Sequence, residues 1–418
     1  MTGHEPAGAA TTPDGVGDVG DVVLVSLEPW DDVWRRNQHL AAGLLRRFPT
    51  ARLLVVEPPA DPLHDAARRA RPRGGRGLRP GPALDGVGAG RLWLLQQTKT
   101  WPRRVDGGGD RRRARGVRRA AARAGLRRPV LWANDPGAAD VLAATGWPTL
   151  YDVTDDWAAA RRPPAEHARI VAAEDLLLAR AREVTVCSPA LAERKGASRP
   201  VALVTNGVDV AASRAPRPRP ADLPPGPCAV YVGTLHRDRL DVGLCVRTAA
   251  ALGRAGTLVL VGPVALDREE AAQLRAAGVV LTGARPFADV PGYLQHAAAL
   301  VVPHVVDGFT DSLDPIKLYE YRAVGRPVVA TPVAGFRDRA SGTGPVVTVA
   351  DAAAFPAAVA AVLADPPPSL PADDVPTWDG QVTRFAAALA RAGAAPRSGA
   401  RPGGPSGAEP EPRAARPR

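Results

Sequence analysis

The chain has 418 residues, of which 45% are hydrophobic and only 5% aromatic, which predicts two domains with cores of alanine, valine and leucine. The formal net charge is +11, but the basic runs at 68–80 and 110–128 contain no aromatic residues on which bases could stack, which argues against nucleic-acid binding. The sequence contains no run of about 18 apolar residues and no secretory pattern at its start, so neither a membrane-spanning helix nor a secreted protein is expected.

Strands and helices alternate through the first half of the chain. Residues 1–20 lack periodicity and predict a disordered tail. Helices are expected at 31–48 and 166–181, and a basic helix is expected after residue 97. A loop or insertion rich in Gly, Pro and Arg separates the strand expected at 51–59 from the strand expected at 91–97. Buried strands are expected at 21–27, 51–59, 91–97, 129–135, 148–156 and 183–188, with one more ending at 204–209.

A second alternating array follows a proline-rich segment. Residues 211–227 are stiff and cannot join the centre of a sheet, so they predict a linker between domains at 21–210 and 228–375. Valine-rich strands buried on both faces indicate parallel sheets. The predicted fold class is therefore α/β, with two doubly wound, Rossmann-like parallel-sheet domains facing a cleft, and a second disordered tail at 393–418. The strands of the second array are expected at 228–235, 257–263, 279–284, 299–304 and 326–332.

Candidate ligand residues of the second array lie just after its strands, where open parallel sheets bind their ligands. Gly233 and Thr234 follow the strand at 228–235, and Arg237 and Arg239 come next. Two arginines can hold a diphosphate. Because only three of the 54 basic residues are lysines, such an arginine pair also arises by chance.

The stretch "DPIKLYEY" is more informative. Asp314 and Pro315 favour a helix start, and Lys317 in the first turn adds a cation to the anion-binding end of that helix. Glu320, one turn later, could accept hydrogen bonds from a ribose diol. The alternative is a surface Lys–Glu pair worth about 0.3 kcal/mol.

In the first domain, candidate residues follow the first strand and face the expected cleft. Tryptophan and guanidinium groups suit a sugar or an anionic acceptor, although the sequence alone is equally consistent with Trp34 as a core residue. Asp155 follows a later strand in a carboxylate cluster that could bind a metal or cap a helix. The acceptor-site candidates are Glu28, Trp30, Trp34, Arg35, Gln38 and Asp155.

Several segments together resemble one enzyme family. "YVGTLHRDRLD", "DPIKLYEYRAVGRPVVAT" and "VTNGVD" are similar to retaining glycosyltransferases of the GT-B fold, family 4 type. "WDDVWRRNQHLAAGL", "LYDVTDDW" and "TWDGQVTRFAAAL" resemble the bacterial teichuronic-acid and capsule transferases of that family. The resemblance runs in order over most of residues 21–390. It implies an acceptor-binding first domain, a donor-binding second domain, and a helix at 376–392 that returns to the first domain.

The resemblance also implies roles for individual residues. Glu320 would hold the ribose of a nucleotide-sugar donor, and Arg239 takes the place of a phosphate-binding lysine. Thr234 stands where the family has an arginine, so Arg237 is expected to substitute. Ser312 replaces a glutamate that touches the transferred sugar, which leaves Asp311 and Asp314 to contact it.

The implied function is transfer of a sugar, with retention and without a metal or cofactor, from a nucleotide-diphosphate sugar to a sugar or lipid-linked acceptor in cell-surface polysaccharide or glycoconjugate synthesis. Lys317, Arg239 and the helix start would neutralise the leaving diphosphate. The alternatives are a nucleotide-sugar epimerase or hydrolase and a non-catalytic basic binding protein.

The expected location is the cytoplasm. The scattered cysteines Cys187, Cys228 and Cys245 are interpreted as buried thiols in a reducing compartment. The arginine-rich surface leaves open a peripheral contact with an anionic membrane at its inner face.

Overall fold

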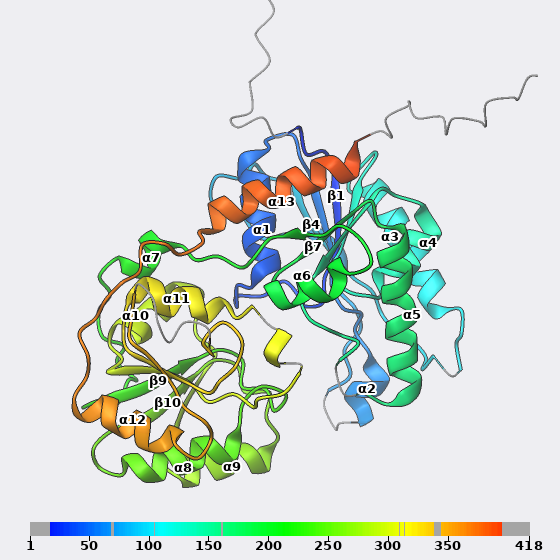
Figure 1. The fold of residues 1–418 in the computed structure, drawn as a ribbon. Helices are drawn as coiled ribbons and strands as arrows, with labels where there is room; N and C mark the ends of the chain where they lie inside the picture. The colour runs from blue at the N-terminus through cyan, green and yellow to red at the C-terminus, as the bar shows by residue number, and fades with distance from the viewer. Residues whose placement is uncertain are drawn as a thin grey trace, which may run out of the picture.

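The computed structural model describes residues 17–67, 71–103, 105–159, 162–308, 310–312, 314–337 and 344–394. Within these ranges the chain forms two α/β domains, each built on one sheet with helices on both faces (Figure 1). The predicted fold class is therefore confirmed. The tails predicted as disordered lie outside the described residues, apart from 17–20 and 393–394.

The first sheet has eight strands in the order β3-β4-β2-β1-β5-β6-β7-β8, and each neighbouring pair is parallel except β3 with β4. The exposed β3 was not predicted, because its sequence GLRP has no apolar periodicity. The other strands lie within or beside their predicted ranges. Their bounds are β1 (Val22–Val25), β2 (Leu53–Val56), β3 (Gly77–Pro80), β4 (Leu92–Gln96), β5 (Val130–Ala133), β6 (Thr149–Val153), β7 (Glu183–Val186) and β8 (Ala202–Leu203).

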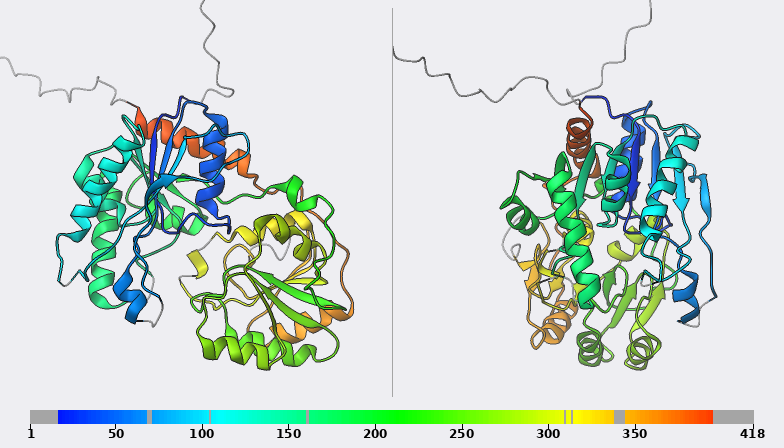
Figure 2. Two further views of the ribbon diagram at one scale, coloured as in Figure 1. Left: turned by 180° about the vertical axis from the view of Figure 1, so that it is seen from behind. Right: turned by 90° about the vertical axis from the view of Figure 1, so that its right-hand side faces the viewer.

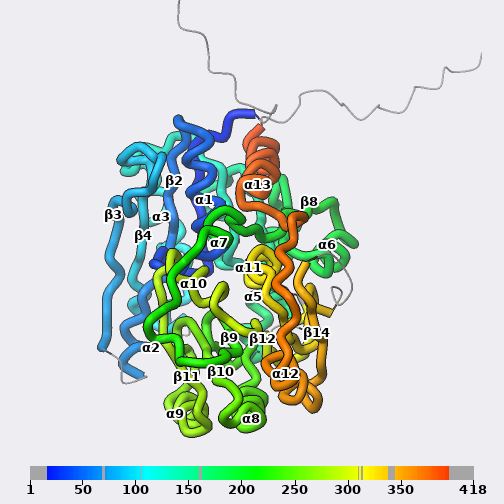
Figure 3. The backbone as a smooth tube through the Cα atoms, turned by 90° about the vertical axis from the view of Figure 1, so that its left-hand side faces the viewer, coloured from blue at the N-terminus to red at the C-terminus, as the bar shows by residue number. Residues whose placement is uncertain are grey.

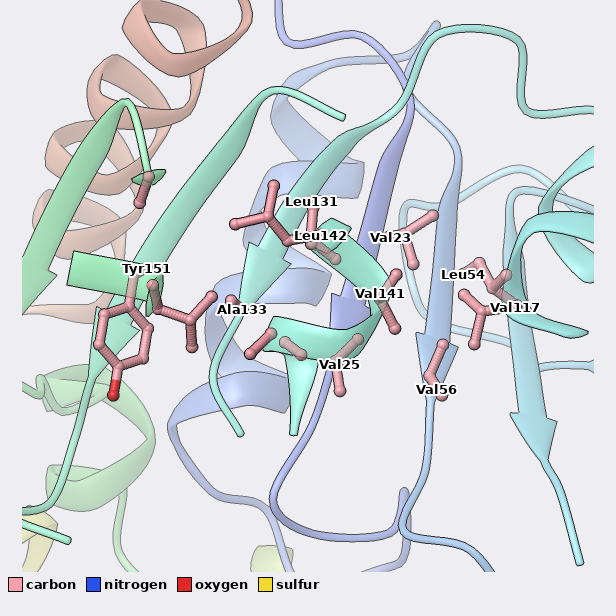
Figure 4. Close-up of a cluster of buried hydrophobic side chains, with 14 of the residues drawn as sticks. Val23, Val25, Leu54, Val56, Val117, Leu131, Ala133, Val141, Leu142 and Tyr151 are labelled. Carbon is pink, nitrogen blue, oxygen red and sulfur yellow. The ribbon is translucent and has the colours of Figure 1, made fainter. Parts of the chain in front are cut away.

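Helices bury both faces of this sheet. On one face α1 (Arg36–Arg47) and α13 (Trp378–Gly393) enclose a core around Leu24, Trp132 and Phe385. The other face is covered by α3 (Gly109–Arg123), α4 (Ala138–Thr145) and α5 (Pro164–Arg180). Figure 4 shows strand residues such as Val23 and Leu54 beside Val117 of α3. Two short helices, α2 (Pro62–Ala67) and α6 (Pro189–Gly196), follow β2 and β7.

The second sheet has six parallel strands in the order β11-β10-β9-β12-β13-β14. Their bounds are β9 (Cys228–Val232), β10 (Thr257–Val261), β11 (Val280–Gly283), β12 (Ala299–Val302), β13 (Val328–Ala330) and β14 (Val347–Val349). One face is covered by α8 (Val242–Leu252), α9 (Arg268–Ala276) and α12 (Phe355–Ala364), and the other by α10 (Val290–Gln295) and α11 (Ile316–Val324). The 3-10 turns η1 (Phe287–Asp289) and η2 (Thr310–Ser312) precede α10 and α11.

The chain crosses between the domains twice, and the two crossings are hydrogen-bonded to each other. Val208 N donates to Pro376 O at 2.9 Å, and Trp378 N donates to Val208 O at 3.3 Å. A Cβ on Gly207 would lie 2.7 Å from Trp378 N, so glycine permits this approach. After the second crossing α13 lies on the first domain, although it follows the second domain in sequence (Figures 2 and 3).

Two boundaries differ from prediction in ways that affect the site. The helix predicted from residue 31 begins at Arg36, because the side chain of Gln38 accepts a hydrogen bond from Arg35 N and donates one to Asp31 O. The proline-rich linker begins with the short helix α7 (Val210–Arg214), which Asp209 caps. Cys187, Cys228 and Cys245 are buried free thiols, as predicted.

Candidate functional site

The second sheet reverses its strand order between β9 and β12, and ligands of open parallel sheets bind at such a reversal. Gly233 follows β9 and His304 follows β12. Helix α11 begins beside them and directs Lys317 toward both. The first sheet reverses between β1 and β5, from which Glu28 and its neighbours extend.

Lys317 lies in the first turn of α11. Its Nζ is 3.9 Å from the centroid of the Tyr231 ring and 3.3 Å from His304 Nε2. A Cβ on Gly233, whose φ is +148°, would lie 3.1 Å from the same Nζ, so only glycine leaves this approach open. Burial, and secondly Arg239, lower the pKa of Lys317 well below its ordinary value. A bound anion would oppose both effects.

Glu320, one turn further along α11, lines a pocket of about 180 Å³ between the domains. The remaining lining is mostly apolar. Burial raises the pKa of Glu320 to about 7, although Lys317 opposes the rise. A few polar side chains in a largely apolar wall, among them the Glu320 carboxylate, suit a ligand that joins a flat ring to hydroxyl groups. The lining residues are Val208, Asp209, Ala212, Ser213, Arg217, Phe287, Ala288, Val290, Pro291, Leu294, Glu320 and Trp378.

Arg239 lies at the cleft and faces the first domain. Its Nη2 is 3.4 Å from Asp155 Oδ1, so two residues assigned to different substrates from the sequence form an ion pair across the domains. Glu28 lies in the same cluster. Desolvation raises the pKa of Glu28, Arg35 opposes this, and Asp155 and Arg239 also act on it. Arg35 Nε lies 3.2 Å from Glu28 Oε2. The cleft thus brings carboxylates and guanidinium groups of both domains together.

Asp314 has a different position from the one predicted. The N-cap of α11 is Pro315, without a side-chain cap, and the helix begins at Ile316. Asp314 Oδ2 accepts a hydrogen bond from Asn206 N at 2.5 Å, and Asp314 Oδ1 accepts one from Tyr319 Oη at 2.5 Å. The carboxylate therefore links the segment before α11 to the first crossing, and its contact with a sugar stays a prediction.

Four further residues were predicted at the donor site. Arg237 Nη2 lies 3.5 Å from Glu270 Oε1 of α9, and its side chain is 68% exposed, so the structure does not bring it to Lys317. Asp311 forms an ion pair with Arg337 at 3.2 Å. Ser312 ends η2, and its side chain lies outside the described part of the structure. Thr234 is partly buried beside Gly233.

The tryptophan candidates of the first domain are partly buried. The Trp34 ring stacks on Phe287 of η1 with centroids 6.3 Å apart, so it contacts the second domain. Trp30 packs beside the core under α1, and its backbone N–H donates to Glu57 Oε1. Gln38 is buried, and its amide holds the start of α1. Gln38 also lines a small pocket with Glu28 and Trp30, so its role toward an acceptor stays a prediction.

A buried network next to the cleft was missed by the sequence analysis. Arg36 donates to both carboxylate oxygens of Asp152, at 3.0 and 3.1 Å, and also to Thr205 O at 3.0 Å. Asp152 accepts a further bond from Thr185 Oγ1. Nothing in the sequence distinguished Arg36 from the many surface arginines.

The sequence analysis also missed His304 and the stacked pair of His39 and Trp378. His304 was predictable in part, because it lies two residues after the end of a buried strand. His39 stacks on Trp378 with centroids 4.3 Å apart, and desolvation lowers its pKa to about 3. No group of three or more metal-ligating side chains occurs in the described ranges, and none of the described helices is long and apolar enough to cross a membrane.

Residues 226–365 match the family model described as glycosyl transferases group 1. Over 221 residues the chain is 28% identical to TuaH of Bacillus subtilis (strain 168), named as a teichuronic acid biosynthesis glycosyltransferase. That match covers 49% of this chain and 55% of the relative, so the chain spans about half the length of the curated relative.

Solved structures are similar over nearly the whole chain. OtsA covers 90% of this chain and 95% of its own, with a TM-score of 0.56 and 11% identity. HepE of Anabaena, in complex with UDP and glucose, covers 90% and 94%, with a TM-score of 0.56 and 13% identity. The α,α-trehalose 6-phosphate synthase of Burkholderia multivorans covers 90% and 95%, with a TM-score of 0.54 and 14% identity. The chain shares with these proteins the predicted GT-B architecture.

Proposed function

We propose that this protein is a glycosyltransferase that moves a sugar from a nucleotide-diphosphate sugar to an acceptor of cell-surface polysaccharide or glycoconjugate synthesis. The placement of Lys317 carries the proposal. It is a lysine without a carboxylate within 4.0 Å among the described residues, set at the strand reversal of a domain that matches the glycosyl transferases group 1 model. Such a cation suits a ligand that brings its own negative charge.

The diphosphate, the ribose and the base of the nucleotide-sugar donor would each bind a different, neighbouring group of residues. The diphosphate would lie between Lys317 and Arg239, against the backbone at Gly233. The ribose would bind Glu320, and the base would occupy the apolar pocket beside Phe287. These cations can neutralise the leaving diphosphate, which supports transfer without a metal.

The acceptor would enter from the first domain, where Glu28, Arg35 and Asp155 face Arg239. Trp30 and Trp34 would border its path. As the donor approaches Arg239, the Arg239–Asp155 pair can exchange for a contact with phosphate, leaving the Asp155 carboxylate to accept a hydroxyl hydrogen bond. We propose that the sugar is transferred with retention, which NMR of the anomeric proton in the product would test.

The first experiment is a thermal-shift panel of UDP, GDP, ADP and CDP, followed by transfer assays with the sugar donors of the stabilising nucleotide. Wild-type protein should be stabilised by one diphosphate more than by the others. Lys317→Ala and Glu320→Ala should nearly abolish transfer and remain folded, whereas Lys99→Ala, at a partly exposed pair with Asp61, should retain it. Full activity of purified Glu320→Ala protein would contradict the proposal.

The same assays distinguish the alternatives. An epimerase or hydrolase on this fold would convert the donor without an acceptor. A non-catalytic basic protein would respond to salt and DNA and not to nucleotides. Transfer that persists in EDTA would support the metal-independent reaction.

We further propose that the protein works at the cytoplasmic side of an anionic membrane. The supporting feature is α3, whose exposed face carries arginines, together with Trp101 and Val105 before it, which are 59% and 68% exposed. Binding to vesicles of phosphatidylglycerol, without binding to phosphatidylcholine, would support this contact. The exposed arginines of α3 are Arg111, Arg112, Arg115, Arg118, Arg119 and Arg123.

A further inference from the structure

His304 occupies the centre of the proposed diphosphate site, although none of the predicted roles included it. It lies two residues after the end of β12 and is 4% exposed. Its backbone pairs with the loop that carries Arg239, because His304 forms a bridge with Leu240 and Val305 N donates to Arg239 O at 2.8 Å. Thr331 Oγ1 accepts from His304 N at 3.2 Å and donates to His304 O at 2.9 Å. The backbone of His304 is therefore held by the Arg239 loop and by the Thr331 side chain.

The imidazole of His304 contacts Lys317, the other cation of the proposed diphosphate site besides Arg239. Its Nε2 lies 3.3 Å from Lys317 Nζ and 3.2 Å from Tyr231 Oη. A lysine ammonium has three donors and no acceptor, so with Lys317 charged Nε2 is the acceptor of this bond. The proton of the neutral ring is then on Nδ1. An imidazolium would instead place an N–H against the ammonium.

We infer that His304 is a positioning residue that sets both cations of the site, holding Lys317 through Nε2 and the Arg239 loop through its backbone. This inference rests on the proposed function for its consequence, the grip on a diphosphate. The geometry itself does not depend on that function.

The surrounding charges agree with a neutral ring. The ionisable groups that act on His304 are Lys317 from α11 and Arg239 from the loop after β9, and Tyr231 from β9 contacts it. Burial first, and then these two cations, lower the pKa of His304 well below its ordinary value. The ring therefore remains an acceptor for Lys317 throughout the neutral range.

The hydrogen bond from Lys317 to His304 can be tested without a substrate, because the chain contains only three lysines. Protein labelled with ¹³C at lysine Cε should give signals for Lys99, Lys195 and Lys317, and Lys317→Met identifies the third. The variants are His304→Leu, which removes the acceptor, and His304→Gln, which keeps one. His64→Gln, at a histidine of the short helix α2, is the matched control.

In His304→Leu the pKa of Lys317 should fall by about one unit or more, since a hydrogen bond to the charged form is lost. His304→Gln and His64→Gln should stay within about half a unit of wild type. An unchanged Lys317 pKa in folded His304→Leu protein would overturn the inference. So would ¹⁵N-histidine spectra of wild-type protein that show the His304 proton on Nε2, a result that requires no folded leucine variant.

The consequence for diphosphate binding is measured separately with UDP, GDP, ADP and CDP. His304→Leu should weaken binding of the stabilising diphosphate about tenfold, with less effect on its nucleoside, and His304→Gln should recover most of the loss. If none of the four diphosphates stabilises wild-type protein, the proposed function fails, while the lysine titration still decides the role of His304. Equal affinity of the leucine variant and wild type for the diphosphate would overturn the positioning role.

Discussion

Asp314 and Asn206 link the two domains by two hydrogen bonds, both donated by Asn206 and accepted by Asp314. Asn206 N donates to Asp314 Oδ2 at 2.5 Å, and Asn206 Nδ2 donates to Asp314 O at 2.5 Å. Asn206 lies in the first crossing, and Asp314 lies two residues before α11. Because Asn206 Oδ1 also accepts from Arg36 at 3.4 Å, the start of α11 is tied to the buried network of the first domain.

Asp314→Ala should lower the free energy of unfolding by about 1–3 kcal/mol, because partly buried donors of Asn206 and Tyr319 lose their acceptor. It should also reduce transfer by changing the direction of α11. Guanidinium chloride unfolding and the transfer assay check this. Asp373→Ala is the control, since the Asp373 side chain is 91% exposed. Equal unfolding midpoints for the two variants would contradict this role for Asp314.

Arg36→Met should destabilise the protein by about 3–5 kcal/mol, because it leaves the Asp152 charge buried without its partner. Adding Asp152→Asn should recover part of this loss, since the uncompensated charge is removed. Denaturant titration of the single and double variants measures both values. A double variant less stable than Arg36→Met would indicate that the charge is not the cause.

Glu320→Gln should change how stability depends on pH. The pKa of Glu320 is about 7 in the native state against 4.5 ordinarily, so the native state holds a proton that the unfolded chain has released between these values. Wild-type stability should therefore fall relative to Glu320→Gln as pH rises from 4.5 to 7 and then stay constant. Since one pKa unit corresponds to about 1.4 kcal/mol, a difference of about 2.5 units should give the variant a gain of about 3.5 kcal/mol over wild type between pH 4 and pH 8. Unfolding midpoints from pH 4 to 8 test this, and parallel curves would contradict it.

Gly233→Ala should combine backbone strain with a contact in the site. The added Cβ would lie 3.1 Å from both Lys317 Nζ and Tyr231 Oη. The matched control is Gly278→Ala, where φ is also positive but no atom lies within 4 Å of the added Cβ. Both variants should lose about 1–2 kcal/mol of stability from the strained backbone. Only Gly233→Ala should lose affinity for the stabilising diphosphate in calorimetry, and equal losses at the two positions would show that strain alone matters.

The sequence predicted most strands of both sheets because they are short apolar runs between turn signals. It missed β3 and β14, which lie at sheet edges and lack a continuous buried pattern. For the site, the position of Lys317 after a buried strand was enough to suggest an anion site. Residue type and spacing did not show the hydrogen bonds that Gln38 and Asp314 already make within the protein.

The amino-acid sequence by itself determined the two parallel sheets, the order of their strands along the chain and the glycine after β9, since these follow from apolar periodicity and local backbone preference. Only the tertiary structure decided which side chains share the cleft. It brought Asp155 to Arg239 and Asn206 to Asp314, and it put His304 against Lys317. Such contacts join residues from different strands and crossings, and they depend on packing distances that no local pattern contains.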